Sequence, residues 1–211
     1  MKLWRYIYPR FSDRRLEHRF ILDNNEKAAR QARWGFAFGT FGYAMLGAIA
    51  FFIDEAMFAR TKWLVYGLIM PTHSLAAFGV TYLARFFYLQ WVLVFANIFS
   101  NACVIGILYF APEDFYIKYG YGLVICILIY TFAMLRMRTF FAIVGSSLVI
   151  MQYVAFLLLV RPMLLNDAIY GLALISFVNT AGLFSVFFFE QNSRTEFMQS
   201  RTIEEQSLLL N

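Results

Sequence analysis

The chain has 211 residues, of which 61% are hydrophobic, 20% aromatic and only 15% charged, and its mean hydropathy is +0.62. A soluble domain carries roughly a quarter charged residues, and a disordered chain carries far fewer apolar ones. The composition therefore excludes both classes and indicates an integral membrane protein. The two cysteines, Cys103 and Cys126, lie inside long apolar runs, where a thiol behaves as a small hydrophobic group.

Six apolar runs are each long enough to cross a hydrocarbon core about 30 Å thick as a helix. They occupy residues 34–53, 63–83, 91–110, 116–135, 139–160 and 168–189. The loops between them are too short to hold a second folded domain. The sequence therefore predicts an all-α fold, an integral membrane six-helix bundle over residues 34–189.

The distribution of basic residues predicts the orientation of this bundle. Of the Lys and Arg side chains, 14 lie on one side of the predicted topology and 4 on the other. Because basic residues favour the cytoplasmic side, both termini are expected in the cytoplasm, in a multi-pass protein of the inner or plasma membrane. Trp34, Trp63 and Trp91 each begin a predicted span, which suits the place of an indole ring at the membrane interface.

The polar segment 1–33 precedes the first span and does not have the form of a cleaved signal peptide. Ser12 is placed to cap a helix that carries Leu16 and Phe20, and one of the residues 23–25 to cap a second helix leading into the first span. Aromatic and basic residues between Lys2 and Arg10 suit the anionic surface of a lipid bilayer better than a nucleic acid. This segment is therefore expected to be a cytoplasmic, helical, membrane-contacting region.

Uncharged polar residues lie near the middle of four predicted spans, and none of the six hydrocarbon cores contains Asp, Glu, Lys or Arg. Counted along their helices, the side chains closest to the midplane are His73, Asn101, Gln152 and Asn179. One interpretation is that they join helices by hydrogen bonds. The other is that they line a pocket for the polar head of a lipid-like ligand, with His73 beside the helix-kinking Pro71 as the first candidate.

Catalytic and metal-binding patterns are not found in the sequence. The second histidine, His18, is far from the polar layer, and no Cys or carboxylate shares that layer, so no metal site is expected. The uncharged span interiors also argue against a transporter or pump. Gly35 and Gly39 form a GxxxG pattern, which permits two helices to approach closely.

The tail after Phe189 contains no Gly or Pro, so the sixth span is predicted to continue as a helix over residues 190–211. Arg194, Arg201 and Leu208 share one heptad position, and Phe197 and Glu204 share another. This pattern predicts a marginal two-stranded coiled coil, with a solvated single helix as the alternative. Because the tail stops on three leucines and an asparagine without a cap, we expect it to lead into a further domain.

The tail resembles that of a known family. The pattern Glu-x3-Arg-x2-Phe-x3-Arg-x2-Glu, which ends in Leu208-Leu-Leu-Asn211, is similar to the transducer helix after the six-span membrane domain of class III adenylate cyclases. It is present here as Glu190, Arg194, Phe197, Arg201 and Glu204. The resemblance implies a homodimer whose membrane domains act as anchor and receptor and align two catalytic domains through a parallel coil. It also implies that ATP and a divalent metal, Mg²⁺ or Mn²⁺, bind in a catalytic domain beyond Asn211, so no catalytic residue or cofactor is expected in this chain.

Two other functions fit the same topology. A six-span sensor domain of a histidine kinase also continues into a signalling helix, and it would carry a phosphoacceptor histidine beyond the tail. A small transporter or channel would need a water-lined path, which the uncharged span interiors do not favour.

Overall fold

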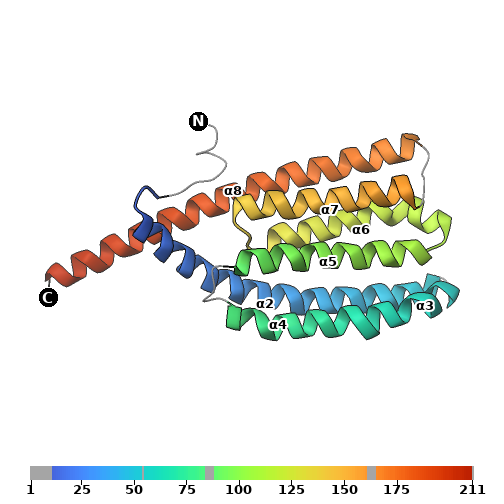
Figure 1. Cartoon of the computed structure of the whole chain (residues 1–211), viewed down its shortest axis with the longest axis horizontal. Helices are drawn as coiled ribbons and strands as arrows, with labels where there is room; N and C mark the ends of the chain where they lie inside the picture. Colours follow the sequence, from blue (N-terminus) through green and yellow to red (C-terminus); the bar gives the residue numbers. More distant parts are fainter. Residues whose placement is uncertain (1–10, 54, 84–87, 161–164, 211) are drawn as a thin grey trace.

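The computed structural model describes residues 11–53, 55–83, 88–160 and 165–210, and over these residues all regular secondary structure is helical (Figure 1). The aromatic and basic stretch before Phe11, and Asn211, lie outside the described residues. In chain order the elements are α2 (Arg14–Ile53), α3 (Glu55–Lys62), the π-helical η1 (Trp63–Ile69), α4 (Met70–Leu83), α5 (Leu89–Phe110), α6 (Glu113–Met134), α7 (Thr139–Leu159) and α8 (Leu165–Leu210).

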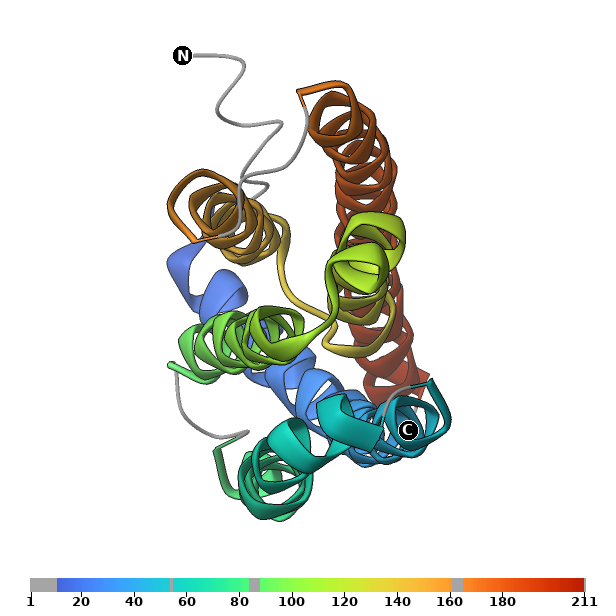
Figure 2. The ribbon, with the colours of Figure 1, turned by 90° about the vertical axis from the view of Figure 1, so that its right-hand side faces the viewer.

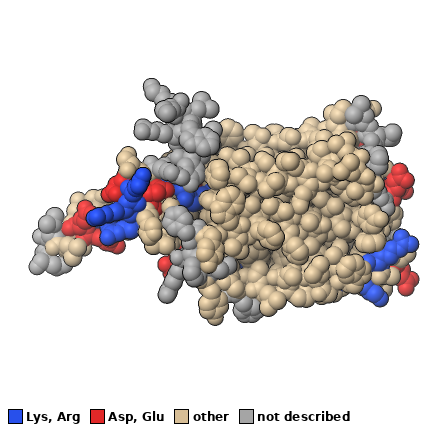
Figure 3. Space-filling view, in the orientation of Figure 1, with Lys and Arg blue, Asp and Glu red and all other residues tan. Residues whose placement is uncertain are grey.

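The surface and the helix lengths are those of a membrane protein. Within the described ranges, four helices are long and apolar enough to span a membrane: α5, α6, α7 and the part of α8 from Asn166 to Leu208. Uncharged residues cover the side of the bundle, and charged residues gather at its two ends (Figure 3). Trp34, Trp63 and Trp91 are 69%, 59% and 51% exposed on that surface. The expectation of an all-helical fold is confirmed over the described residues, and the four long apolar helices together with this apolar surface indicate a membrane protein.

The predicted helix starts in the first 33 residues were wrong. One helix, α2, runs without a break from Arg14 to Ile53 and includes both the N-terminal segment and the first predicted span. Asp13, not Ser12, caps it, because its Oδ1 accepts a hydrogen bond of 2.8 Å from the Arg15 N–H. Asn24 and Asn25 are buried inside the helix, where tertiary packing has overridden their preference for a cap.

The second predicted span, 63–83, coincides with η1 and α4. The π-helical turn lies directly before Pro71, and the Met70 N–H bonds to the Val65 carbonyl, five residues back. Proline lacks an N–H and its ring collides with the carbonyl four residues earlier, so the wider turn relieves this conflict. The side chains of Thr72 and His73 then bond to the carbonyls of Leu68 and Ile69.

Close helix contacts at glycines set the packing of the bundle. Helix α2 lies against α4, α5 against α7, and α6 against α8, as seen along the bundle in Figure 2. At Gly182 of α8 a Cβ atom would collide with the ring of Phe132 from α6. Gly35 faces Met134 of α6, and Gly39 faces Tyr130, so the GxxxG pattern of α2 is used within the chain.

Replacing Gly182 by Ala tests the contact between α6 and α8. The added methyl group must displace the Phe132 ring, and overpacking of this kind costs about 1–3 kcal/mol. We expect a lower melting temperature for Gly182→Ala in detergent. The matched control is Gly122→Ala on α6, where a Cβ meets nothing within 4 Å. Equal melting temperatures for the two variants would show that Phe132 does not seat on Gly182.

Candidate functional site

Four charged side chains meet at the end of the bundle from which the last part of α8 projects, here called the tail end (Figure 1). This charge cluster consists of Glu17 from α2, Arg138 from the loop before α7, and Glu190 and Arg194 from α8. The Arg194 guanidinium lies 2.8 Å from Glu17 Oε2 and 3.0 Å from Glu190 Oε1. Arg138 lies 3.1 Å from Glu17 Oε1 and 3.3 Å from Glu190 Oε1. The cluster thus joins three segments that are far apart in sequence.

All four carboxylate oxygens of the cluster accept hydrogen bonds. Glu17 Oε2 also accepts from the Phe11 N–H at 2.9 Å, and Glu190 Oε2 accepts from the Thr139 N–H at 2.8 Å. Thr139 is the first residue of α7, so the Glu190 carboxylate also lies at the positive end of that helix dipole. The four side chains are between 4% and 12% exposed. Removing one charge would leave a nearly buried cluster with an uncompensated net charge, which is strongly destabilising.

Aromatic rings enclose one side of the cluster. Phe20 stacks edge-to-face with both Phe11 and Phe197, at centroid distances of 5.7 and 5.6 Å. The Arg194 guanidinium lies 4.2 Å from the centre of the Phe20 ring and 5.0 Å from that of Phe11. These contacts exclude water on that side and add cation–π attraction to the ion pairs.

The residues predicted for a coil seam fall into two groups. Arg194 and Phe197 are covered by Phe11, Glu17 and Phe20 of the same chain. Beyond them, Arg201 is half-buried, and Glu204 and Leu208 are exposed. In this structure the first part of the predicted seam is therefore in contact with the N-terminal part of α2, and the second part is accessible.

The environment shifts the pKa of two members of the cluster. Burial alone would raise the pKa of Glu17, but the hydrogen bond from Arg194, the Phe11 N–H and the charges of Arg194 and Arg138 lower it below its ordinary value of 4.5. Burial alone would lower the pKa of Arg194, but its bonds to Glu17 and Glu190 raise it. Both shifts favour the ionised cluster.

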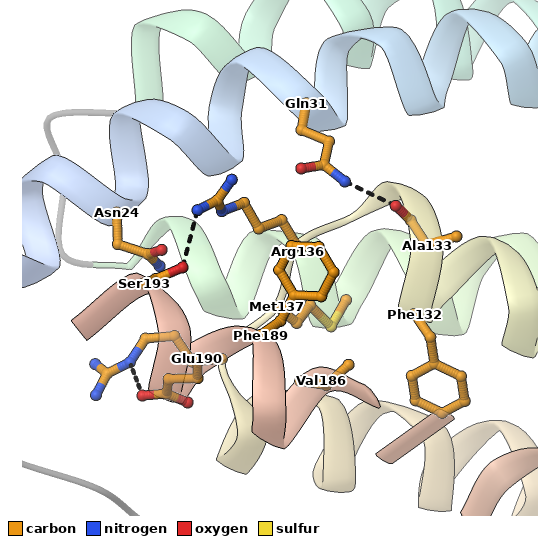
Figure 4. A pocket seen from close by; sticks show the side chains of 11 residues that line it. Asn24, Gln31, Phe132, Ala133, Arg136, Met137, Val186, Phe189, Glu190 and Ser193 are labelled. Carbon is orange, nitrogen blue, oxygen red and sulfur yellow. Dashed lines mark hydrogen bonds and ion pairs between the residues drawn. The ribbon is translucent and has the colours of Figure 1, made fainter. Parts of the chain in front are cut away.

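A small hollow of about 70 Å³ lies beside the cluster, between α2, the loop after α6 and α8 (Figure 4). Arg136 points across it and donates a hydrogen bond of 3.1 Å to Ser193 Oγ. Arg136 follows the end of α6 with a φ of 45°, a left-handed conformation that glycine adopts more easily. Gln31 of α2 donates a hydrogen bond of 2.7 Å to the Ala133 carbonyl of α6. These bonds hold α2, α6 and α8 together next to the charge cluster.

Helix α5 carries the polar residues of the bundle interior, and it bonds to four neighbouring segments. Asn101 donates hydrogen bonds to Gln152 Oε1 at 2.9 Å and to the Val149 carbonyl at 3.2 Å, both on α7. The Thr131 hydroxyl of α6 donates to Asn97 Oδ1 at 2.6 Å. Further bonds join Ser100 to His73 of α4 at 2.9 Å and the Ser100 carbonyl to the Tyr43 hydroxyl of α2 at 2.8 Å.

Of the four predicted ligand-binding residues, the structure brings Asn101 and Gln152 together and places His73 on another side of α5. The Asn179 Oδ1 atom of α8 is buried and has no hydrogen-bond partner. The four side chains are thus spread through the bundle interior. This arrangement supports interhelical hydrogen bonding, and the ligand role remains a prediction.

No sequence pattern indicated Glu17 and Arg138 as partners of the tail, or Tyr43 and Thr131 as partners of α5. The available signal for the cluster was that Arg138 and Glu190 directly flank predicted spans, whereas Glu17 lies 17 residues before the first one. Their pairing depends on contacts across 121 and 177 residues of sequence, which local patterns do not reveal.

In comparisons with family models, with curated proteins and with solved structures, no match to the chain is found. Over the described ranges no group of three His, Cys, Asp or Glu side chains is placed to hold a metal ion. The features of the chain that bear on function are therefore the charge cluster and helix α8.

Replacing Glu17 by Gln tests the charge cluster through its pH dependence. Since the pKa of Glu17 is lowered, its contribution to stability is fully present at neutral pH and is lost as the pH falls through that lowered pKa, below 4.5. At pH 7 we expect Glu17→Gln to reduce the free energy of unfolding by about 2–3 kcal/mol. Melting curves of wild type and variant should converge below pH 4.5.

The control is Glu26→Gln on the same helix. The Glu26 side chain is 73% exposed and lies 3.9 Å from an equally exposed Arg30, so its loss should leave the melting temperature nearly unchanged. Two results would contradict an ionised cluster. One is an equal melting temperature of wild type and Glu17→Gln at pH 7, and the other is a difference in melting temperature at pH 3 that is as large as at pH 7.

Proposed function

We propose that this chain is the membrane domain of a signalling protein, in which α8 passes a change in the bundle to an effector in the cytoplasm. In this proposal the six predicted spans cross the inner or plasma membrane, and the tail end faces the cytoplasm. The excess of basic residues on that side supports the orientation. The observation that carries the proposal is the form of α8, which continues far beyond the bundle.

Helix α8 has 46 residues without an interruption. After Gly182 it contains no Gly or Pro, so the part within the bundle and the projecting part form one stiff rod. At 1.5 Å per residue, a helix of this length is about 70 Å long. A tilt or rotation of its membrane part would therefore move the projecting part as a rigid body.

In the proposal, the charge cluster gives the tail end two conformations, one with the cluster closed and one with it open. When it is intact, the N-terminal part of α2 covers Arg194 and Phe197. A parallel coil between two copies would then be limited to Arg201, Glu204 and Leu208. If the cluster opens, Arg194 and Phe197 become available and the seam lengthens toward the membrane. Signalling proteins commonly use two packings of this kind that are close in energy.

The resemblance of the tail suggests the effector. In the proposal, two copies align the catalytic domains of a class III adenylate cyclase, which bind ATP and Mg²⁺ or Mn²⁺ and form cyclic AMP. The supporting residues are the pattern at Glu190, Arg194, Phe197, Arg201 and Glu204. Two of these five belong to the charge cluster, which connects the family-like pattern to the geometry of the tail end.

Insertions into the tail test transmission by α8. The chain is joined after Asn211 to the catalytic domain of a class III adenylate cyclase, and cyclic AMP formation is measured in membranes. Two residues inserted after Ser200 rotate the tail by about 200°, whereas seven restore its heptad phase. We expect the two-residue insertion to reduce activity at least fivefold and the seven-residue insertion to retain it.

Equal activity for both insertions would contradict a helical transmission. The same pair of insertions joined to a histidine-kinase core separates the two effectors. If activity depends on the heptad phase of the insertion only in the kinase fusion, the effector is a histidine kinase and not a cyclase.

A further inference from the structure

A cavity of about 240 Å³ lies between α2, α4, α5 and α6, away from the charge cluster. Its wall includes Phe38, Gly42, His73, Leu123, Cys126 and Tyr130. Phe38 is 62% exposed and Cys126 is exposed, so the cavity opens through the side of the bundle. A molecule dissolved in the surrounding lipid could enter it without crossing water.

Glycines on α2 leave this space open. A Cβ at Gly42 would meet nothing within 4 Å, and one at Gly39 would reach His73 and Tyr130 at ordinary contact distances of 3.4 and 3.6 Å. Phe38 and Leu46 both line the cavity and lie eight residues apart on α2. Their separation corresponds to about 12 Å along the helix. The cavity is therefore elongated in the direction of the helices.

The polar groups of the wall differ in whether they have partners. His73 Nδ1 lies 3.1 Å from the Ile69 carbonyl, which only accepts, so Nδ1 donates and Nε2 of the neutral ring accepts from the Ser100 hydroxyl. The Tyr43 hydroxyl donates to the Ser100 carbonyl. The Tyr130 hydroxyl, in contrast, is buried and has no hydrogen-bond partner in the part of the chain that the structure describes.

An unpaired buried hydroxyl is costly, by about 1–3 kcal/mol, and it points to a missing acceptor. The lining contains no charged side chain, so it does not compensate an ionised ligand. Tyr130 lies at one end of the elongated cavity. It is seven residues from Leu123 on α6, which corresponds to about 10 Å along the helix.

We propose that this cavity binds one neutral, single-chain molecule from the bilayer, whose carbonyl oxygen accepts a hydrogen bond from Tyr130. The chain of the ligand lies along α2 and α6 toward Leu46 and Leu123. This assignment deepens the proposed receptor function, and it relies on that function only for its role in signalling. It replaces His73 by Tyr130 as the residue that recognises the polar group.

The site is connected to α8 through α6. Phe132, two residues after Tyr130, seats on Gly182 of α8, and Gly35 of α2 packs on Met134 of the same α6 segment. A ligand that separates α2 from α6 would therefore shift the surface on which α8 rests. The ligand is thus linked to the tail through the contacts of α2 with α6 and of α6 with α8.

The test uses the 211-residue chain in a maltoside detergent, with decan-2-one as the probe and undecane as a probe of similar size without an acceptor. Binding is read from the increase in melting temperature over a range of probe concentrations. Wild type should respond to the ketone more strongly than to the alkane. Tyr130→Phe should weaken ketone binding about tenfold and bring it to the level of the alkane. This variant removes an unpaired hydroxyl, so it should fold as well as wild type.

A second variant tests the cavity itself. Gly42→Leu fills the space and should abolish the response to both probes, whereas Gly122→Leu, at an open position outside the wall, should respond as wild type does. A ketone preference that survives in Tyr130→Phe or in Gly42→Leu, or a wild type that does not distinguish the probes, would overturn the assignment. The binding test contains no effector domain, so its failure would reject the ligand site alone. Transmission by α8 is tested separately by the two-residue and seven-residue insertions into the tail.

Discussion

The arrangement of the tail end depends on the mutual neutralisation of four nearly buried charges. Each of the two carboxylates there contacts both guanidinium groups, so the charges compensate one another pairwise. This requirement brings together the start of α2, the loop before α7 and the point where α8 leaves the bundle. Ion pairs of this kind add little net stability compared with apolar packing, but they penalise every arrangement that leaves one charge unpaired. The cluster therefore specifies the direction of α8 more than it strengthens the fold.

Inside the bundle, α5 joins its neighbouring helices through hydrogen bonds between uncharged polar groups. Between hydrocarbon-exposed helices there is no hydrophobic driving force, so small residues and interhelical hydrogen bonds determine packing. Asn97, Ser100 and Asn101 each bond to a different neighbour, and together they fix the position of α5 relative to α4, α6 and α7. The Tyr130 hydroxyl is buried beside the cavity and has no hydrogen-bond partner among the described residues. Other buried polar atoms, such as Asn179 Oδ1, also lack a partner, but the Tyr130 side chain lines a cavity in which the proposed ligand supplies an acceptor.

Apolar run length predicted much of the fold. The predicted spans 91–110, 116–135 and 139–160 differ by at most three residues at each end from α5, α6 and α7. The predicted starts of the N-terminal helices were wrong because Asn25 is buried and accepts a hydrogen bond of 3.4 Å from Gln90. This tertiary contact outweighs the local preference of Asn for a helix cap. The candidate site was predicted only in part. Polarity identified His73, which lines the cavity, but Tyr130 is one of 13 tyrosines, and only the structure shows that its hydroxyl lacks a partner among the described residues.

The charge cluster fixes the projecting part of α8 to the start of α2. Double electron–electron resonance tests it directly, with spin labels on cysteines introduced at Leu22 of α2 and Met198 of α8, in a background where Cys103 and Cys126 are alanine. Both positions are exposed, at 36% and 39%, so the labels need not disturb the cluster. We expect one narrow distance distribution in lipid nanodiscs and a broad one after Arg194→Gln. A broad distribution with Arg194 in place, or an unchanged narrow one without it, would contradict the account.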